Sequence, residues 1–388
     1  MLCYLCRWRR SELIVTTMLR RRSTTCWYYS AGSLQLFCGV FALIEASVIS
    51  NDVSLPTEVL ATSGDDPVKD QCLAVVVKGP GSCYCTPLAE IHCHNLTAVP
   101  EFRRDGAHYS AVYLDQQDIT SLPAAVFQHL RVSRIVLNFN PMSAGLSKDS
   151  LRGLETSVRE LEMGACQLTE LPETLLNGMS RLRRLHLWAN RIRRIPGGFF
   201  GGADELRELL LWGNEVEELD ALSLGGLWNL RRLDLDRNRL TAVSKDAFRH
   251  LLELHSLRLN DNLVEALHAE TFVYMESLKS LSMDDNRISY VHERAFAGLS
   301  TLISLSLSRN SISYLPDELF APLINLVFLR LDSNRIEYVW PRTFIGPYRS
   351  HWKSLFTVLI LEEAGTHESA KTLFLRLVTL TFDLMTPK

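Results

Sequence analysis

The stretches LRRLHLWANRIRRIPGGFF (residues 182–200) and LRELLLWGNEVEELDALSL (residues 206–224) place leucines, one asparagine and later apolar residues at equivalent positions. The pattern occurs seven times, and its asparagines lie 24 residues apart, at Asn190, Asn214, Asn238, Asn262, Asn286, Asn310 and Asn334. The L-x-L segment predicts a short strand, whose side chains alternate between two faces. A single copy cannot bury its own leucines, so stacked copies must bury them together. The repeat therefore predicts a solenoid.

The asparagine of each copy has a structural interpretation. It follows the strand and points inward, where its amide can bond backbone groups of neighbouring turns. A buried backbone group left unpaired costs about 1–3 kcal/mol. Earlier copies are irregular and place Gln117, Asn140 and Cys166 at this position, which gives ten repeats in all. We therefore interpret Cys166 as a buried ladder residue, not a reactive thiol.

The period and its leucine and asparagine pattern resemble the leucine-rich repeat. From Cys72 to Pro347 the chain is similar to the secreted and cell-surface proteins of the 24-residue class, such as the Nogo receptor, the acid-labile subunit, Slit and the leucine-rich neuronal proteins. The resemblance implies an α/β solenoid: a right-handed horseshoe with a parallel concave sheet and a cysteine-rich N-terminal cap. It also implies binding of a protein ligand outside the cell.

Four cysteines, Cys72, Cys83, Cys85 and Cys93, precede the repeats. The resemblance implies the pairs Cys72–Cys85 and Cys83–Cys93, although Cys72 lies further from Cys83 than is usual. The residues alone allow three pairings. A zinc site is an alternative, but the spacing does not match the common zinc fingers. The triplet that begins at Asn95 (Asn-Leu-Thr) is an acceptor for N-glycosylation.

The start of the chain predicts a targeting segment. Arg20, Arg21 and Arg22 precede an apolar run at residues 34–44, and small residues follow. This order is typical of a signal peptide. An uncleaved signal anchor is the alternative, but the run is shorter than the roughly 20 residues that span a bilayer. Translation from either Met1 or Met18 is compatible with the pattern.

The domain organisation follows from these segments. We predict a leader at 1–50, a linker at 51–71, a cap at 72–100, ten repeats at 101–347 and a divergent tail at 348–388. The tail has no cysteine, whereas the related proteins usually end in a cysteine-rich cap. A degenerate last repeat and an ending replaced by truncation or splicing remain alternatives, and membrane attachment stays open.

Side chains that alternate with the buried leucines form columns on the predicted concave face. Trp188 and Trp212 stand on adjacent strands with Leu210 between them, and we predict that they form the centre of a protein-binding site. Tryptophan is enriched among residues that dominate binding energy. The predicted polar surround is His186, Asp234, Asp236 and Arg258.

Charged residues form two further groups. A basic stripe runs along the strand entrances, at Arg159, Arg183, Arg207, Arg231, His255 and Lys279. It is interpreted either as a solvated edge that pairs with neighbouring glutamates or as a site for sulfated glycosaminoglycan. An acidic group around Asp234, Asp236 and Asp284 suggests calcium, but we expect a solvated polar face because no calcium-loop motif occurs. No metal or cofactor is expected.

The sequence contains no phosphate loop, G-x-S-x-G or H-E-x-x-H motif, so we expect no enzyme activity. The net charge of −3 gives no reason to expect a nucleic-acid partner. The predicted function is recognition of an extracellular or cell-surface protein through the concave face. The alternatives are a matrix protein that binds fibrils or glycosaminoglycan, and an ectodomain fragment of a membrane receptor.

Overall fold

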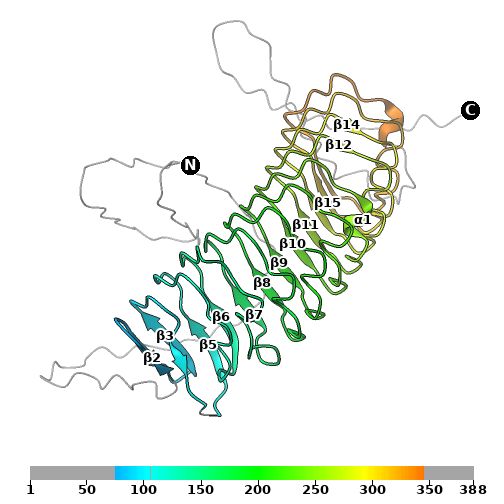
Figure 1. Ribbon diagram of the computed structural model, residues 1–388. Coiled ribbons are helices and arrows are strands. Elements are labelled where there is room, and N and C mark those ends of the chain that lie inside the picture. The colour runs from blue at the N-terminus through cyan, green and yellow to red at the C-terminus, as the bar shows by residue number, and fades with distance from the viewer. Residues whose placement is uncertain (1–74, 105, 345–388) are drawn as a thin grey trace, which may run out of the picture. The chain divides into compact units, whose positions relative to one another are not determined.

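The computed structural model describes residues 75–104 and 106–344. Their main feature is one twelve-stranded sheet, in which ten parallel strands follow one another in chain order (Figure 1). These are β5 (Tyr109–Tyr113), β6 (Val132–Val136), β7 (Glu160–Glu162), β8 (Arg184–His186), β9 (Glu208–Leu210), β10 (Arg232–Asp234), β11 (Ser256–Arg258), β13 (Ser280–Ser282), β15 (Ser304–Ser306) and β16 (Phe328–Arg330). The predicted solenoid is thereby confirmed, with about ten turns.

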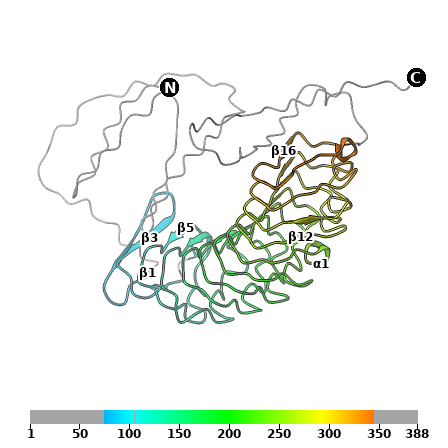
Figure 2. The same ribbon diagram turned by 90° about the horizontal axis from the view of Figure 1, so that it is seen from above.

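The register of the sheet follows the repeat. Leu185 pairs with Leu209, and Leu209 pairs with Leu233, so equivalent residues lie side by side. The strands line the inner side of the curved solenoid, and the return segments lie outside them (Figure 2). The residues that alternate with the leucines therefore form continuous columns on the concave face.

The core is a set of stacked layers, one for each repeat. The repeat leucines are buried, and Leu185, Leu209, Leu233, Leu257 and Leu305 have no exposed surface. On the outer side, four ring contacts join the phenylalanines that follow each asparagine by ten places, with centroids 5.3–6.4 Å apart, at Phe248, Phe272, Phe296, Phe320 and Phe344. Each layer thus buries its apolar residues against the next layer.

The asparagines form the predicted ladder through the turns. In Asn262, Oδ1 accepts the N–H of Leu240 at 3.1 Å, while Nδ2 donates to the carbonyls of Leu235 (2.9 Å) and Leu259 (3.1 Å). One amide thus joins the turn before it and closes its own turn. At the equivalent position the buried Cys166 is a free thiol that donates to a carbonyl at 3.1 Å. Burial raises the pKa of this thiol to about 11, which agrees with a buried ladder residue.

The N-terminal cap covers the first edge of the sheet. Strands β2 (Ser82–Cys85) and β3 (Glu90–His94) pair antiparallel, and β3 continues into the parallel sheet through β5. Cys83 and Cys93 form a disulfide, as the resemblance implied, and Cys85 is also disulfide-bonded. These three sulfurs are therefore not zinc ligands. Cys72 lies outside the described residues.

The remaining elements are short. Strand β1 (Val75–Val76) pairs with β4 (Glu101–Phe102), and β12 (Ala266–Leu267) pairs with β14 (Tyr290–Val291). Helical structure within residues 75–344 is limited to α1 (Lys245–Phe248) and the 3-10 helix η1 (Pro341–Phe344). The outer side is therefore built mostly from turns.

Three predicted segments fall on residues that the structure does not describe: the leader at 1–50, the linker at 51–71 and the tail at 348–388. Within the described part of the chain, no helix combines the length and the apolar character that a membrane crossing requires.

The layered core predicts a position-dependent cost of shortening leucine. Leu259 is fully buried, whereas Leu252 is 46% exposed in the same repeat. We expect Leu259→Ala to lower the free energy of unfolding by about 2–5 kcal/mol, because it leaves a cavity in a layer. Leu252→Ala should change it by less than about 1 kcal/mol. Denaturant unfolding measures both, and equal effects would contradict the assigned layers.

Candidate functional site

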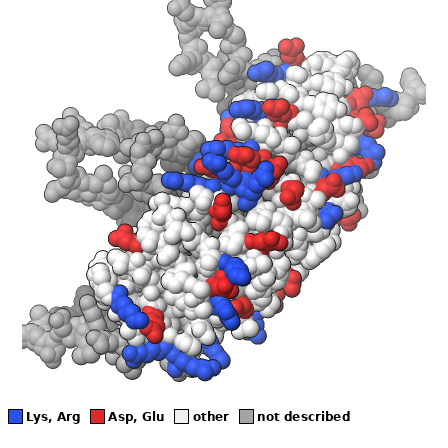
Figure 3. Space-filling view, viewed as in Figure 1, with Lys and Arg blue, Asp and Glu red and all other residues white. Residues whose placement is uncertain are grey.

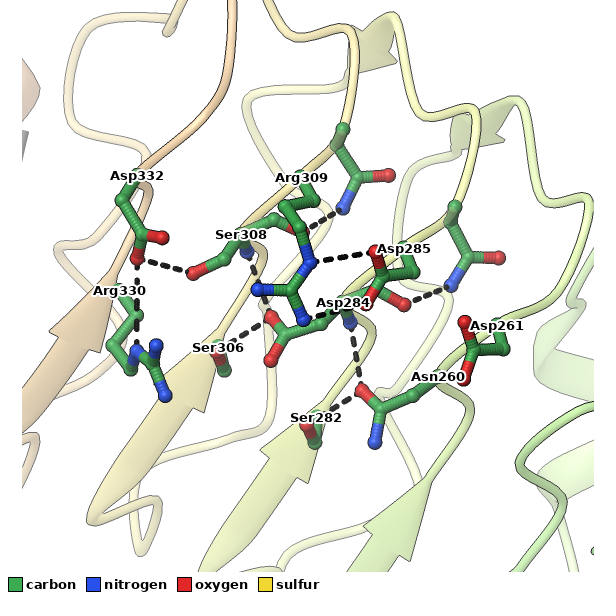
Figure 4. A network of polar contacts seen from close by, with 12 residues as sticks. Asn260, Asp261, Ser282, Asp284, Asp285, Ser306, Ser308, Arg309, Arg330 and Asp332 are labelled. Atoms are coloured by element: carbon green, nitrogen blue, oxygen red, sulfur yellow. Dashed lines mark hydrogen bonds and ion pairs between the residues drawn. The ribbon is translucent and has the colours of Figure 1, made fainter. Parts of the chain in front are cut away.

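The concave face carries a second ladder, formed by the residues two places before each asparagine. Oδ1 of Asp236 accepts the N–H of Asn260 at 2.8 Å. Oδ1 of Asn260 accepts the N–H of Asp284 at 2.8 Å, and Asp284 accepts the N–H of Ser308 at 2.7 Å (Figure 4). Each side chain thus satisfies the equivalent backbone group of the next repeat. These residues have a structural role that the sequence analysis missed.

Serine hydroxyls complete this second ladder. Ser282 donates to Asn260 at 2.7 Å, and Ser306 donates to Asp284 at 2.6 Å (Figure 4). Beside it, the guanidinium of Arg309 forms two hydrogen bonds of 2.6 Å with the carboxylate of Asp285. The acidic residues of this region therefore bond backbone, hydroxyl and guanidinium groups. Their contacts explain the acidic group without a calcium ion.

Trp188 and Trp212 occupy the same column but interrupt the second ladder. Their rings are stacked, with centroids 5.2 Å apart and planes 3° from parallel. Phe139 meets Trp188 edge to face at 5.4 Å. The indole of Trp188 lies over Gly164, where a Cβ atom would come within 2.2 Å of the ring. The two tryptophans are thus part of one half-buried aromatic stack rather than separate projecting side chains.

Phe139 extends this stack, although the sequence analysis did not include it. It directly precedes a ladder asparagine, has a φ of 60° and is 40% exposed. A large side chain in the left-handed region is unusual. An exposed aromatic at a turn position that favours small or polar residues was the signal in the sequence.

Leu210 and His186 lie on neighbouring strands, as predicted, and pair in register. Leu210 is half-buried. His186 is more enclosed, and burial lowers the pKa of its imidazole, against the opposing effect of Glu162 and Glu208. Nε2 of His186 is a buried atom with no hydrogen-bond partner among the residues that the structure describes. Its distance to Oε1 of Glu208 is 3.7 Å.

The predicted polar surround is a compact ion-paired group. Nε of Arg258 lies 3.3 Å from Oδ2 of Asp234, and its Nη2 bonds Asp236. Burial, together with the charge of Asp236, raises the pKa of Asp234. Both carboxylates are covered, whereas the side chain of Arg258 is 46% exposed. A ligand on this side of the tryptophans would therefore meet Arg258 rather than the carboxylates.

The basic stripe lies at the strand entrances, and its residues differ in whether they have a polar partner. Arg183 pairs with Glu205 at 3.0 Å, and Nδ1 of His255 lies 2.6 Å from the carbonyl oxygen of Glu253. The exposed Arg159, Arg207, Arg231 and Lys279 form no ion pair with any residue in the described ranges. In the visible view, acidic and basic side chains are intermixed over much of the surface (Figure 3).

Three titratable side chains form a group that the sequence analysis also missed. Glu160, Glu162 and His186 each offer a ligand atom, and these atoms lie within 4.8 Å of one another. They come from two neighbouring strands, so no local spacing in the sequence brings them together.

The predicted glycosylation acceptor lies on the surface. Asn95 is exposed, follows β3 and has a φ of 56°, and Thr97 of the same triplet is also exposed. Its accessibility agrees with an acceptor role, and glycosylation itself stays a prediction.

Comparison with known proteins agrees with this geometry. The leucine rich repeat family profile matches residues 180–239, 228–288 and 276–336. These turns are leucine-rich repeats. No curated protein matches the chain.

Solved structures share the solenoid. A chain of the Toll–Spatzle complex from Drosophila has a TM-score of 0.56 and 27% identity, over 60% of this chain and 33% of that chain. A chain of the TLR13–ssRNA13 complex has a TM-score of 0.50 and 25% identity, over 61% of this chain and 38% of that one. The chain thus spans between a third and two fifths of the length of these two neighbours.

A third neighbour comes from the octameric complex of latrophilin 3, Unc5D and FLRT2. It has a TM-score of 0.51 and 24% identity, over 65% of this chain and 83% of that chain. This likeness concerns the fold alone.

Proposed function

We propose that this protein is a non-enzymatic recognition module that binds a protein ligand through its concave face, centred on Trp188 and Trp212. The single observation behind the proposal is that two tryptophans occupy the part of the column, from Gly164 to Trp212, in which no side chain accepts the equivalent N–H of the next repeat. Elsewhere in the column, Asp236, Asn260 and Asp284 accept a backbone N–H from the next repeat. A tryptophan side chain cannot accept such a bond.

The interruption has a local consequence. The N–H of Asp236 bonds Oδ1 of Asp234 at 3.1 Å, rather than the preceding side chain of the column, which is Trp212. An intramolecular hydrogen bond contributes about 0.5–1.5 kcal/mol to stability. Two large rings thus stand where the fold uses short acceptors. A ligand-binding role would explain why tryptophan occupies these two positions.

The aromatic stack has the properties of an interface centre. Stacked indoles offer a rigid apolar surface that loses little conformational entropy on binding, and tryptophan is enriched among the residues that dominate interface energy. Leu210 adds an apolar neighbour, while Arg258 and His186 supply polar groups at the edge. Similar folds in complexes with Spatzle and with ssRNA13 support a recognition role. The net charge of −3 favours a protein over a nucleic acid here.

An extracellular or cell-surface location is part of this proposal. Disulfides persist mainly in oxidising compartments, and the cap holds the Cys83–Cys93 bridge and a disulfide-bonded Cys85. The basic and apolar order of the first 50 residues and the exposed Asn95 and Thr97 of the acceptor triplet also favour this location. A secreted protein and the ectodomain of a membrane receptor both fit these features.

The proposed site predicts a selective loss of binding. The partner would first be recovered from cell-surface extracts with the wild-type chain and identified. Trp188→Ala and Trp212→Ala should each weaken its binding by at least about 2 kcal/mol, the range of a hot-spot residue. Trp228, which is 47% exposed and stacks on His250 away from the strands, provides the matched control. Trp228→Ala should leave affinity unchanged. If Trp188→Ala and Trp212→Ala bound the partner as tightly as Trp228→Ala and the wild type, the site would lie elsewhere.

Binding of sulfated glycosaminoglycan is a second candidate function. The observation that favours it is the exposure of Arg159, Arg207 and Arg231 without ion pairs in the described part of the chain. Three guanidinium groups on consecutive or nearby repeats can contact a linear polyanion. Such a function would suit a matrix protein.

This second candidate predicts salt-sensitive retention on heparin. Replacement of Arg159, Arg207 and Arg231 by glutamine should lower the salt concentration of elution, because fewer counterions are released on binding. A triple variant that changes Arg193, Arg239 and Arg309, all ion-paired, provides the control and should elute near the wild type. Absence of retention at low salt would rule out this function.

A further inference from the structure

Glu160, Glu162 and His186 form a compact group beside the aromatic stack. Glu160 and Glu162 are two places apart on β7, so both side chains lie on the concave face. His186 on β8 is the register partner of Glu162. One ligand atom from each lies within 4.8 Å of the other two. The repeat therefore places one imidazole nitrogen and two carboxylates around one point.

The histidine gives this group an available ligand atom. Nε2 of His186 is buried and bonds no residue in 75–104 or 106–344, while Oε1 of Glu208 remains 3.7 Å away. A buried polar atom without a partner is unfavourable. In a neutral imidazole one ring nitrogen carries no proton and keeps its lone pair. An incoming cation could use that lone pair.

We propose that Glu160, Glu162 and His186 form a binding site for a zinc ion. Zinc accepts imidazole nitrogen and carboxylate oxygen, and sites with three protein ligands leave a fourth position open. Calcium and magnesium prefer oxygen ligands alone, so the histidine counts against them. The site shares His186 with the edge of the proposed protein-binding face, but none of its three ligands belongs to the aromatic stack.

Two arginines compete with zinc for the carboxylates. Nη2 of Arg134 lies 2.5 Å from Oε1 of Glu162, and Nη2 of Arg184 lies 2.7 Å from Oε2 of Glu160. Oε1 of Glu162 accepts both Nε and Nη2 of Arg134, and its Oε2 accepts Nδ2 of Asn138 at 2.8 Å, so zinc must displace Arg134 from Glu162. The two arginine side chains are 39% and 52% exposed, so they have room to turn toward solvent. Removal of Arg134 should therefore strengthen zinc binding, whereas it would weaken a group whose role is only ion pairing.

The test is a titration of the full chain with zinc chloride, followed by calorimetry. The wild type should bind one zinc ion that His186→Asn and Glu162→Gln weaken at least tenfold. Arg134→Gln should bind zinc at least as tightly as the wild type. The matched control is Glu205→Gln, which removes a carboxylate paired to an arginine at 3.0 Å outside the group and should not change the affinity. Circular dichroism would check that every variant folds.

The contrary results are equally specific. No saturable binding by the wild type would overturn the proposal. Unchanged affinity in both His186→Asn and Glu162→Gln would also overturn it. Weaker binding in Arg134→Gln would show that the arginine supports rather than opposes the bound ion, which contradicts the competition argued above.

Discussion

The turn after each strand depends on one interaction, the bonding of backbone groups by the inward asparagine. That turn has no regular ladder, and the residue before the asparagine is often in the left-handed region, as at Arg237, Asp261 and Arg309. Left-handed backbone costs roughly 1–2 kcal/mol for a non-glycine residue. The amide of Asn262 offsets such strain with four hydrogen bonds to two turns. Because most turns are fixed in this way, equivalent residues of successive repeats stay in register.

Because equivalent residues stay in register, they line up in columns that form continuous surfaces. Side chains from adjacent strands lie close enough to bond, so the concave face can be satisfied from within, as the second ladder at Asp236, Asn260 and Asp284 shows. The face is therefore not a uniform polar surface. It is a structural ladder interrupted at Gly164, Trp188 and Trp212, and the two tryptophans are the part that the fold does not explain.

Much of the fold could be predicted because a fixed period determines which Cα atoms become neighbours. The strands, the buried leucines, the ladder role of Cys166 and the Cys83–Cys93 pair follow from spacing and resemblance. Spacing does not determine side-chain torsions or hydrogen-bond partners. The collapse of Trp188 onto Gly164 depends on such torsions, and Phe139 was therefore missed. The acceptor role of Asp284 could not be separated from simple solvation for the same reason.

The central claim is that Trp188 and Trp212 occupy positions where the fold otherwise uses hydrogen-bond acceptors, and that their function is to bind a ligand. It is tested most directly by the free energy of unfolding of a chain in which Trp188→Asn and Trp212→Asp restore the residue types of the column. Loss of the ring stack costs about 0.5–1.5 kcal/mol beyond burial, and two restored hydrogen bonds contribute about as much each. Because the two half-buried indoles also lose some buried apolar surface, the account predicts a net loss below about 3 kcal/mol. A loss above about 3 kcal/mol, typical of a core aromatic, would contradict it and make the stack a structural element.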